Sequence, residues 1–348
     1  MKRPVQLGAS EGRFRGAPRQ PLQRSKGRQM MMKVRLILGT MTFGSQVDAS
    51  GSGEMLQRFF SSGQKELDTA YVYNDGETEK ILGALLSKEK KFSPYIATKA
   101  HPRSFGRLDG ETVLLQLNES LKRLKRKKVD LFYLHAPDAN TPMEEALRAC
   151  AALHEEGKFD ELGLSNFPAW MVVKAWYLCR ENGWPLPAVY QGMYNALSRR
   201  PEDELFPALK ELGIRFYAYN PLAGGLLTGK YTSYNTRPSD GRFAAMPFYQ
   251  DRYWKKSLFR AIESLTNECW AEGIPPVSAA FRWLAHHSEL DFGHGDGIIL
   301  GATSIAQLEQ NLQACEQGEL PGRIVEAYDR AWEEGKAESP AYFRIYSP

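Results

Sequence analysis

Cysteine is scarce in this sequence of 348 residues, and its spacing excludes two kinds of site. The four cysteines, Cys150, Cys179, Cys269 and Cys315, lie far apart, and no Cys-x-x-Cys pair occurs. A disulfide framework or a structural zinc site needs more cysteines at closer spacing. We therefore expect reduced thiols in an intracellular, cytoplasmic protein.

Long hydrophobic runs and metal-ligand motifs are also absent. No stretch of 18 apolar residues occurs, so the sequence predicts no transmembrane helix and no membrane partner. A metal-dependent barrel hydrolase could use His135, Asp68 and Asp138. However, no His-x-His motif and no cluster of histidines and carboxylates accompanies them, so we expect no metal site.

Basic charge is confined to one end of the chain. Residues 1–33 contain nine Lys or Arg and one acidic residue, a net charge of +8, so the remainder carries −4 of the total of +4. No basic stripe suggests a nucleic-acid partner. Residues 1–33 are rich in Gly, Pro, Gln and Arg, which predicts a disordered basic tail before a domain at 34–348. This tail is also compatible with a mitochondrial presequence, although its amphipathic pattern is poor.

Short apolar runs recur eight times, and segments of helical periodicity separate them. The predicted strands span residues 34–39, 65–68, 95–99, 129–135, 161–165, 188–191, 215–219 and 297–300. The predicted helices span residues 76–86, 112–124, 143–156, 169–182, 204–212 and 306–317. Alternating strands and helices imply parallel strands. Eight such units imply an α/β fold of the closed (β/α)8 type, a TIM barrel.

An open doubly wound sheet is the main alternative fold. It would need a Gly-rich fingerprint after its first strand, and the LGTMTFG segment has glycines without that spacing. Residues 221–252 read as a long loop, and such an insertion on the catalytic face of a barrel is usually functional. We expect the tail at 321–348 to contain one helix and then to pack over the barrel mouth.

Four ionisable side chains follow three of the predicted strands: Asp68 and Tyr73, then Lys99, then His135. They should converge, because the carboxyl ends of barrel strands share one face. A phenol is a weak acid with a pKa of about 10, and a neighbouring ammonium lowers that pKa. A carboxylate keeps the ammonium charged, and a histidine orients the carbonyl that receives the proton. The alternative is a structural Asp68–Lys99 ion pair, which leaves His135 unexplained.

The order and spacing of these residues resemble the aldo-keto reductase superfamily. The similar motifs are Asp-x-Ala-x-x-Tyr from Asp68, Gly-x-x-Glu from Gly76, the strand that ends at Lys99, and Leu-His-x-Pro-Asp from Leu134. GLSNF, YQGMYN, NPLAGGLLTGKY, GRF and ATSIAQLEQN follow in order, so the resemblance covers about residues 34–344. The middle segments are most similar to the aflatoxin-aldehyde (succinic semialdehyde) reductase branch.

The resemblance implies an NADPH-dependent reductase of aldehydes, in which Tyr73 donates the proton and Lys99, Asp68 and His135 support it. It implies substrates such as succinic semialdehyde, dicarbonyls and the aflatoxin dialdehyde. The implied cofactor-binding residues are Asp68, Ser165, Asn166, Gln191, Tyr219, Asn220, Leu222, Gly224, Gly225, Leu226, Lys230, Arg242, Thr303, Gln307, Gln310 and Asn311. The implied substrate-binding residues are His135, Tyr249, Arg252 and Arg344.

Two segments depart from the commonest pattern of the superfamily. Gly301-Ala302-Thr303 stands where Pro-Lys-Ser/Thr is usual, which removes a phosphate-binding lysine and weakens the preference for NADPH over NADH. LGTMTFG also resembles potassium-channel β-subunits. The alternative function is therefore a cofactor-binding, redox-sensing regulatory subunit, which turnover of aldehydes would distinguish from an enzyme. A homodimer is compatible with the sequence.

Overall fold

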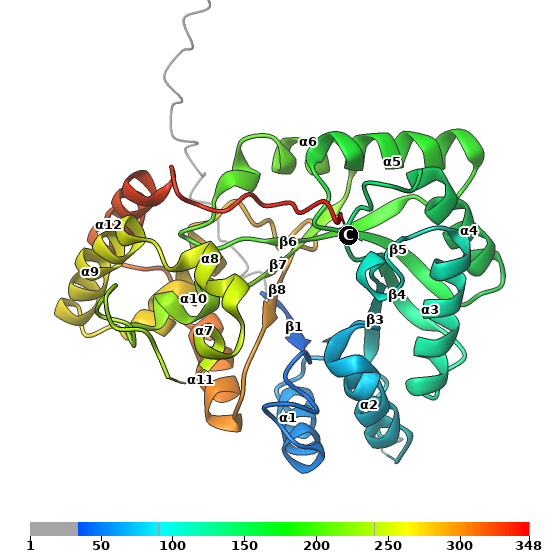
Figure 1. Cartoon of the computed structure of the whole chain (residues 1–348). Helices are drawn as coiled ribbons and strands as arrows, with labels where there is room; N and C mark the ends of the chain where they lie inside the picture. Colours follow the sequence, from blue (N-terminus) through cyan, green and yellow to red (C-terminus); the bar gives the residue numbers. More distant parts are fainter. Residues whose placement is uncertain (1–33, 89–90, 240, 348) are drawn as a thin grey trace, which may run out of the picture. The chain divides into compact units, whose positions relative to one another are not determined.

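Eight parallel strands close into a barrel in the part of the chain that the computed structural model describes, residues 34–88, 91–239 and 241–347 (Figure 1). Each strand pairs with the next, and β1 pairs with β8, so that Leu38 lies opposite Leu300. The strands are β1 (Arg35–Gly39), β2 (Glu66–Asp68), β3 (Tyr95–Ala100), β4 (Val129–Leu134), β5 (Phe159–Ser165), β6 (Pro187–Met193), β7 (Arg215–Tyr219) and β8 (Gly297–Leu300). The predicted TIM barrel is confirmed. The predicted basic tail, residues 1–33, lies outside the described residues.

All six predicted helices are present, with ends shifted by two residues or fewer. They are α2 (Glu77–Lys88), α3 (Gly110–Arg123), α4 (Met143–Glu155), α5 (Ala169–Asn182), α6 (Leu205–Leu212) and α11 (Ile305–Glu316). The expected helix of the tail is α12 (Gly322–Gly335). The sequence reading missed α1 (Ala49–Ser61), α9 (Lys256–Ala271) and α10 (Pro276–His286). Helix α1 begins with glycines and serines, which do not show helical periodicity in the sequence. Its buried face carries Met55, Leu56 and Phe59.

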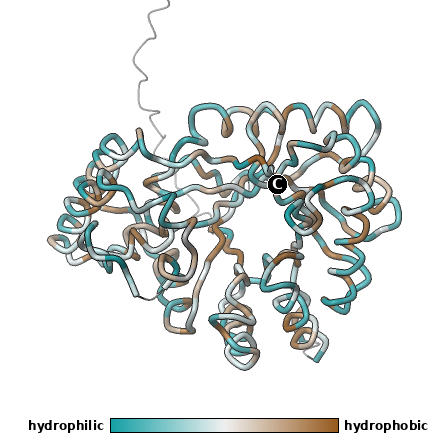
Figure 2. The backbone as a smooth tube through the Cα atoms, in the orientation of Figure 1, coloured by the Kyte–Doolittle hydropathy of each residue, from teal (hydrophilic) through white to brown (hydrophobic). Residues whose placement is uncertain are grey.

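Apolar side chains fill two layers of the barrel. An inner cluster contains Ile37, Ala97, Leu131, Tyr133, Val189, Tyr217 and Ile299. A larger cluster lies between strands and helices, and hydrophobic residues recur along both kinds of element in Figure 2. Gly163 makes room for the Tyr133 ring, since an added Cβ would lie 2.2 Å from a ring carbon. No helix in the described ranges has both the length and the apolar character needed to cross a bilayer.

The segment expected as a long loop is built into short helices instead. These are η4 (Ala223–Thr228), α7 (Gly241–Ala245) and α8 (Pro247–Tyr253). Short 3-10 turns also occur as η1 (Tyr73–Gly76), η2 (Pro102–Ser104) and η3 (Arg200–Glu202). Pro247 starts α8 at a position where a missing N–H costs nothing. These elements stand beside the strand ends and supply one wall of the site.

The C-terminal tail crosses the strand ends, as the sequence predicted. Beyond α12 it runs towards the ends of β4 and β5 (Figure 1). The Arg344 amide donates to the Asn166 carbonyl at 3.0 Å, and the Tyr346 amide donates to the Pro137 carbonyl at 2.8 Å. The tail is thereby fastened to the loops that follow two barrel strands.

Candidate active site

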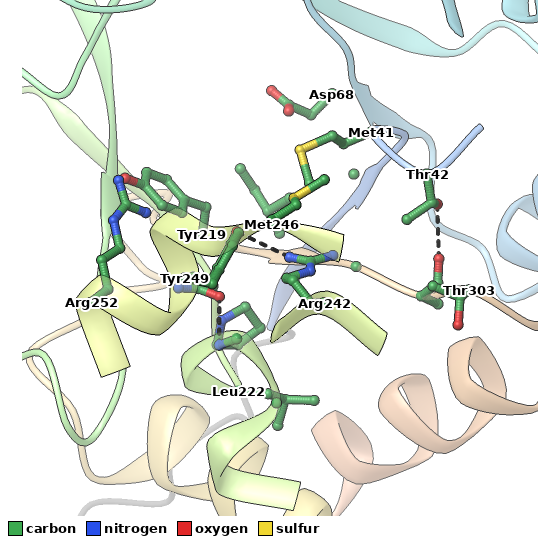
Figure 3. Close-up of a pocket in the computed structure, with 18 of the residues that line it drawn as sticks. Met41, Thr42, Asp68, Tyr219, Leu222, Arg242, Met246, Tyr249, Arg252 and Thr303 are labelled. Atoms are coloured by element: carbon green, nitrogen blue, oxygen red, sulfur yellow. Dashed lines mark hydrogen bonds between the residues drawn. The ribbon is translucent and has the colours of Figure 1, made fainter. Parts of the chain in front are cut away.

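The carboxyl ends of the strands open into a cavity of about 950 Å³. Figure 3 shows part of its lining, with side chains from the strand ends facing those of η4, α7 and α8. All but two of the predicted site residues line this cavity. The exceptions are Lys99, which is fully buried behind Asp68, and Leu226, which packs in the apolar core. A cavity of this size with a few convergent polar groups is typical of a site for a small-molecule ligand and cofactor.

A buried ion pair forms the floor of the cavity. Lys99 Nζ donates to Asp68 Oδ2 at 2.6 Å and to the Thr69 carbonyl at 2.7 Å. Gln191 Nε2 donates to the other carboxylate oxygen of Asp68 at 2.7 Å. Burial lowers the pKa of Lys99, although Asp68 opposes that shift. The carboxylate is thus held at both oxygens, and Gln191 fixes Asp68 in addition to lining the cavity.

Tyr73 lies above this pair, on a turn with unusual backbone geometry. The Tyr73 hydroxyl oxygen is 3.4 Å from Lys99 Nζ. The next two residues, Asn74 and Asp75, have φ values of 47° and 52°, in the left-handed region. Asn74 holds the turn in place, because its Nδ2 donates to the carbonyls of Met41 and Phe43, each at 2.9 Å. The turn aims the phenol into the cavity.

The acidity of Tyr73 differs from the sequence-based expectation. Burial raises the pKa of Tyr73 well above its usual value, and the charge of Asp68 raises it further. The expected net fall in this pKa is wrong for this arrangement, because burial and the negative charge of Asp68 outweigh the effect of the neighbouring ammonium. The phenol is therefore neutral at ordinary pH, which is the protonated state that a proton donor needs.

His135 directly follows β4 and lies beside the Tyr73 phenol. Its ring centroid is 5.9 Å from that of Tyr73, in an edge-to-face arrangement. Its Nδ1 is buried without a hydrogen-bond partner among the described residues. Burial lowers the pKa of His135 well below its usual value, and His101 and Lys99 lower it further. A neutral imidazole at this place can position a carbonyl oxygen but does not bring a competing charge.

Asn166 and Tyr219 form the rim next to His135. Asn166 has a φ of 63°, and its Nδ2 donates to the His135 carbonyl at 2.8 Å and to Ser165 Oγ at 3.0 Å. The Tyr219 hydroxyl donates to Asn166 Oδ1 at 2.7 Å. These bonds connect the ends of β4, β5 and β7 and hold the Tyr219 ring at the cavity wall.

The Gly-rich segment after β7 forms a cradle along the cavity. Gly224 and Gly225 have φ values of 71° and 109°, which glycine adopts readily. Asn220 Oδ1 accepts from the Gly224 amide at 2.8 Å. A Cβ at Gly224 would lie 2.8 Å from the Tyr249 ring, so the backbone approaches that ring closely. Leu222 also lines this part of the cavity.

Two cations and a row of amides line the far end of the cavity. Lys230 and Arg242 come from the cradle and from α7. The Thr303 amide donates to Gln307 Oε1 at 2.9 Å, and Asn311 Nδ2 donates to the Gly301 carbonyl at 3.2 Å. Gln310 lines the same end. These side chains, all of them from the implied cofactor-binding residues, thus line the same cavity.

The predicted substrate residues lie near the barrel mouth. Tyr249 is buried, and its hydroxyl accepts from Arg242 Nη1 at 3.2 Å. The Arg252 guanidinium lies 5.3 Å and 5.8 Å from the ring centroids of Phe248 and Tyr249. Arg344 is exposed on the tail. Both arginines line the cavity, so each can reach a ligand inside it.

Sequence reasoning missed several residues of the lining. The side chains that it did not name include Met41, Gln46, Val72, His101, Arg103, Met246, Phe248 and Tyr346. Met41 follows β1, and His101 and Arg103 follow β3, each within three residues, so the strand-end rule that selected Lys99 could also have selected them. The others come from segments that reach the mouth only through tertiary packing.

No group of three or more His, Cys, Asp or Glu arranged to hold a metal ion occurs in the described ranges.

A closed parallel barrel with a buried Asp–Lys pair, a tyrosine and a histidine at its mouth defines a class of barrel oxidoreductases. The model of the aldo/keto reductase family matches residues 35–333. The chain therefore belongs to the aldo/keto reductase family and is an oxidoreductase. Members of this family use a nicotinamide cofactor.

Curated relatives agree with this assignment and with the resemblance to the aflatoxin-aldehyde branch. The chain is 49% identical over 324 residues to human "Aflatoxin B1 aldehyde reductase member 2", which covers 90% of each chain. It is 48% identical over 319 residues to human "Aldo-keto reductase family 7 member A3", covering 88% of this chain and 96% of the relative. It is 38% identical over 326 residues to "Oxidoreductase sirO" of Leptosphaeria maculans, covering 88% and 96%.

Proposed function

We propose that this protein reduces aldehydes to alcohols with NADPH, and that Tyr73 is the proton donor. The observation that carries this proposal is the convergence of Tyr73, His135 and the Asp68–Lys99 pair on the floor of one large cavity. Each residue alone has a structural explanation. Together they place a neutral acid, a neutral orienting group and a fixed charge pair around one point, as proton transfer to a carbonyl requires.

The residues along the cavity suit a nicotinamide dinucleotide. Ser165, Asn166 and Gln191 would face the nicotinamide carboxamide, and the Gly224–Gly225 cradle would approach the pyrophosphate with backbone N–H groups. Lys230 and Arg242 would hold a 2′-phosphate, which favours NADPH over NADH. Bound there, the cofactor supplies the hydride.

The protein residues act on the carbonyl oxygen. His135 orients that oxygen towards Tyr73, and Tyr73 transfers its hydroxyl proton to it as the alkoxide charge develops. Lys99, 2.6 Å from Asp68 and 3.4 Å from the phenol oxygen, stabilises the phenolate that remains. Tyr219 and the tail shield the reacting centre from water, which strengthens each of these interactions.

The arginines at the mouth favour carboxylated aldehydes. Arg252 and Arg344 line the cavity whose floor holds Tyr73 and His135. A short aldehyde that carries a carboxylate, such as succinic semialdehyde, could place its aldehyde at the floor and its acid at an arginine. Dicarbonyls and the aflatoxin dialdehyde would enter the same cavity. The name of the human relative "Aflatoxin B1 aldehyde reductase member 2" includes aldehyde reduction, which supports this substrate class.

A cofactor titration followed by an aldehyde panel tests the proposal. We expect NADPH to bind more tightly than NADH, and aldehydes to turn over at about 1 s⁻¹ or faster, within the ordinary range for enzymes. Tight binding of NADPH without turnover of any aldehyde would contradict the proposal and favour a redox-sensing regulatory subunit. Failure to bind either cofactor would contradict both functions.

A further inference from the structure

His101 is a second histidine at the floor of the cavity, and the reaction described above leaves it without a role. It follows the last residue of β3, Ala100, and lines the cavity together with His135. Its backbone is clamped by Gln116, a fully buried residue of α3. The His101 amide donates to Gln116 Oε1 at 2.9 Å, and Gln116 Nε2 donates to the His101 carbonyl at 3.3 Å. These two bonds fix the backbone position from which the His101 side chain extends into the cavity.

The tautomer of His101 is set by its own turn. The Arg103 amide donates to His101 Nδ1 at 2.9 Å, so Nδ1 acts as an acceptor. In a neutral imidazole the other nitrogen then carries the proton, and Nε2–H is a donor. Burial lowers the pKa of His101 to about 4, and the charges of Arg103 and Arg344 contribute, so the ring is neutral near pH 7. Nε2 has no hydrogen-bond partner among the residues that the structure describes.

His101 and His135 stand close enough to contact one substrate. Their ring centroids are 4.8 Å apart in an edge-to-face arrangement, and the His135 ring is 5.9 Å from that of Tyr73. A carbonyl oxygen held by Tyr73 and His135 would thus have a third donor beside it. A ring separation of this size lets the two imidazoles contact two different oxygens of one small substrate.

We propose that His101 is a specificity-determining residue that donates a hydrogen bond from Nε2 to a second oxygen of the substrate, on the carbon next to the reacting carbonyl. The favoured substrates are then vicinal dicarbonyls and 2-hydroxyaldehydes. The proposal rests on the proposed function only in placing the first oxygen at Tyr73 and His135. A donor that lines the cavity gains a hydrogen bond from a vicinal dicarbonyl and none from a simple aldehyde, so it discriminates between the two substrates.

Two variants distinguish the role of His101 Nε2 as a donor from the role of Nδ1 in the turn. His101→Asn keeps an acceptor near the position of Nδ1 for the Arg103 amide, and asparagine is favoured at such a capping position, but its side chain does not reach the position of Nε2. His101→Gln brings an amide N–H close to that position. The comparison uses methylglyoxal, a vicinal dicarbonyl, and propanal, which has the same number of carbons.

In His101→Asn we expect kcat/KM for methylglyoxal to fall about three- to tenfold, the range for one neutral hydrogen bond. For propanal it should change less than about twofold, and His101→Gln should recover most of the loss for methylglyoxal. Equal losses for the two aldehydes would show a merely structural role and overturn the proposal. Unchanged kcat/KM for both would overturn it as well.

A binding measurement without reductant keeps this inference separate from the proposed function. The ring nitrogens of the native protein, labelled with ¹⁵N-histidine, are followed by NMR as methylglyoxal or propanal is added, and the His101 signals are assigned by their loss in His101→Asn. We expect the Nε2 signal to shift with methylglyoxal and not with propanal. If the enzyme reduces neither aldehyde but this shift occurs, the proposed function fails and the role of His101 stands. If neither aldehyde moves the signal, the role of His101 is wrong.

Discussion

The two ends of the barrel use the same kinds of side chain for different purposes. At the amino ends of the strands, Arg35, Glu66, Tyr95, Glu161, Arg215 and Tyr217 form what we call the base network. The Tyr217 hydroxyl accepts from Arg35 Nη1 and donates to Glu66 Oε2, each at 3.0 Å. Arg215 Nη2 donates to both oxygens of Glu161 at 2.7 Å, and the Tyr95 hydroxyl donates to the same carboxylate.

The difference lies in how completely each group is paired. In the base network two arginines balance two carboxylates, and both tyrosine hydroxyls donate to a carboxylate. At the mouth, one lysine balances one aspartate, the phenol of Tyr73 has only a 3.4 Å contact, and His135 Nδ1 has no described partner. Groups that are fully paired stabilise a fold, whereas groups left incompletely paired beside a cavity are available to a ligand. In this barrel the base therefore stabilises and the mouth reacts.

The largest effect should come from breaking the buried pair at the mouth. Lys99→Met leaves the Asp68 carboxylate buried without its counter-charge, which typically costs about 3–5 kcal/mol. We expect a much lower midpoint of unfolding in denaturant and no measurable aldehyde reduction. Lys99→Met combined with Asp68→Asn should regain stability but not turnover. A single variant that is as stable as the native protein would contradict this account of the pair.

Breaking the base network should lower stability alone. Glu161→Gln weakens two bonds from Arg215 and one from Tyr95, and hydrogen bonds to a charged group contribute about 1.5–3 kcal/mol each before solvent screening. We expect a loss of about 1–3 kcal/mol in the free energy of unfolding, since the carboxylate is partly exposed. The kcat for an aldehyde should stay within about twofold of the native value. A large fall in kcat of Glu161→Gln with unchanged cofactor affinity would show that the base network also contributes to turnover.

The cations at the far end of the cavity should determine the choice of cofactor. Replacing Lys230 and Arg242 together with Ala should weaken NADPH binding about ten- to a hundredfold, the range for lost charge-assisted contacts. NADH binding should change only a few-fold, as measured by a fluorescence titration. Lys210→Ala, an exposed lysine of α6 outside the cavity, is the control. Equal losses for the two cofactors would refute the assignment.

The arginines at the mouth should affect KM for carboxylated aldehydes only. Arg252→Ala and Arg344→Ala should each raise KM for succinic semialdehyde about tenfold, because a charge-assisted contact with the carboxylate is lost. KM for butyraldehyde should be unaffected. Arg252→Lys, which keeps a charge but loses the planar fork, should lie between. If the native enzyme shows no preference for the acid, the proposed binding of the carboxylate by these arginines is wrong, while the reductase function stands.

Much of the barrel could be predicted because its strands are short apolar runs that local pattern reveals. The four mouth residues could be predicted because Asp68, Lys99 and His135 end or follow strands, and parallel strands end on one face. Helix α10 was missed although Pro276 is acceptable in a first helical turn. Its neighbour α9 lies in the same stretch of the chain, which the sequence reading left unassigned.

Contacts between distant residues could not be predicted from local pattern. Glu66 and Tyr217 in the base network are 151 positions apart and meet only once the barrel has closed. The same holds for Arg344, whose amide reaches Asn166 across the mouth. The pKa of Tyr73 was expected to fall because a lysine stood nearby. Its direction depends on burial and on the sharing of that lysine with Asp68, which only the three-dimensional arrangement reveals.

The most direct test makes the same substitution at both ends, Tyr73→Phe at the mouth and Tyr217→Phe at the base, and measures turnover and unfolding for each. We expect Tyr73→Phe to lower kcat about 10²–10⁴-fold, with cofactor affinity within a few-fold and little change in stability. We expect Tyr217→Phe to keep kcat within about twofold and to lose about 1–2 kcal/mol of stability. Near-normal turnover in Tyr73→Phe, or an equal loss of turnover in both variants, would show that the two ends of the barrel do not divide reaction and stability in this way.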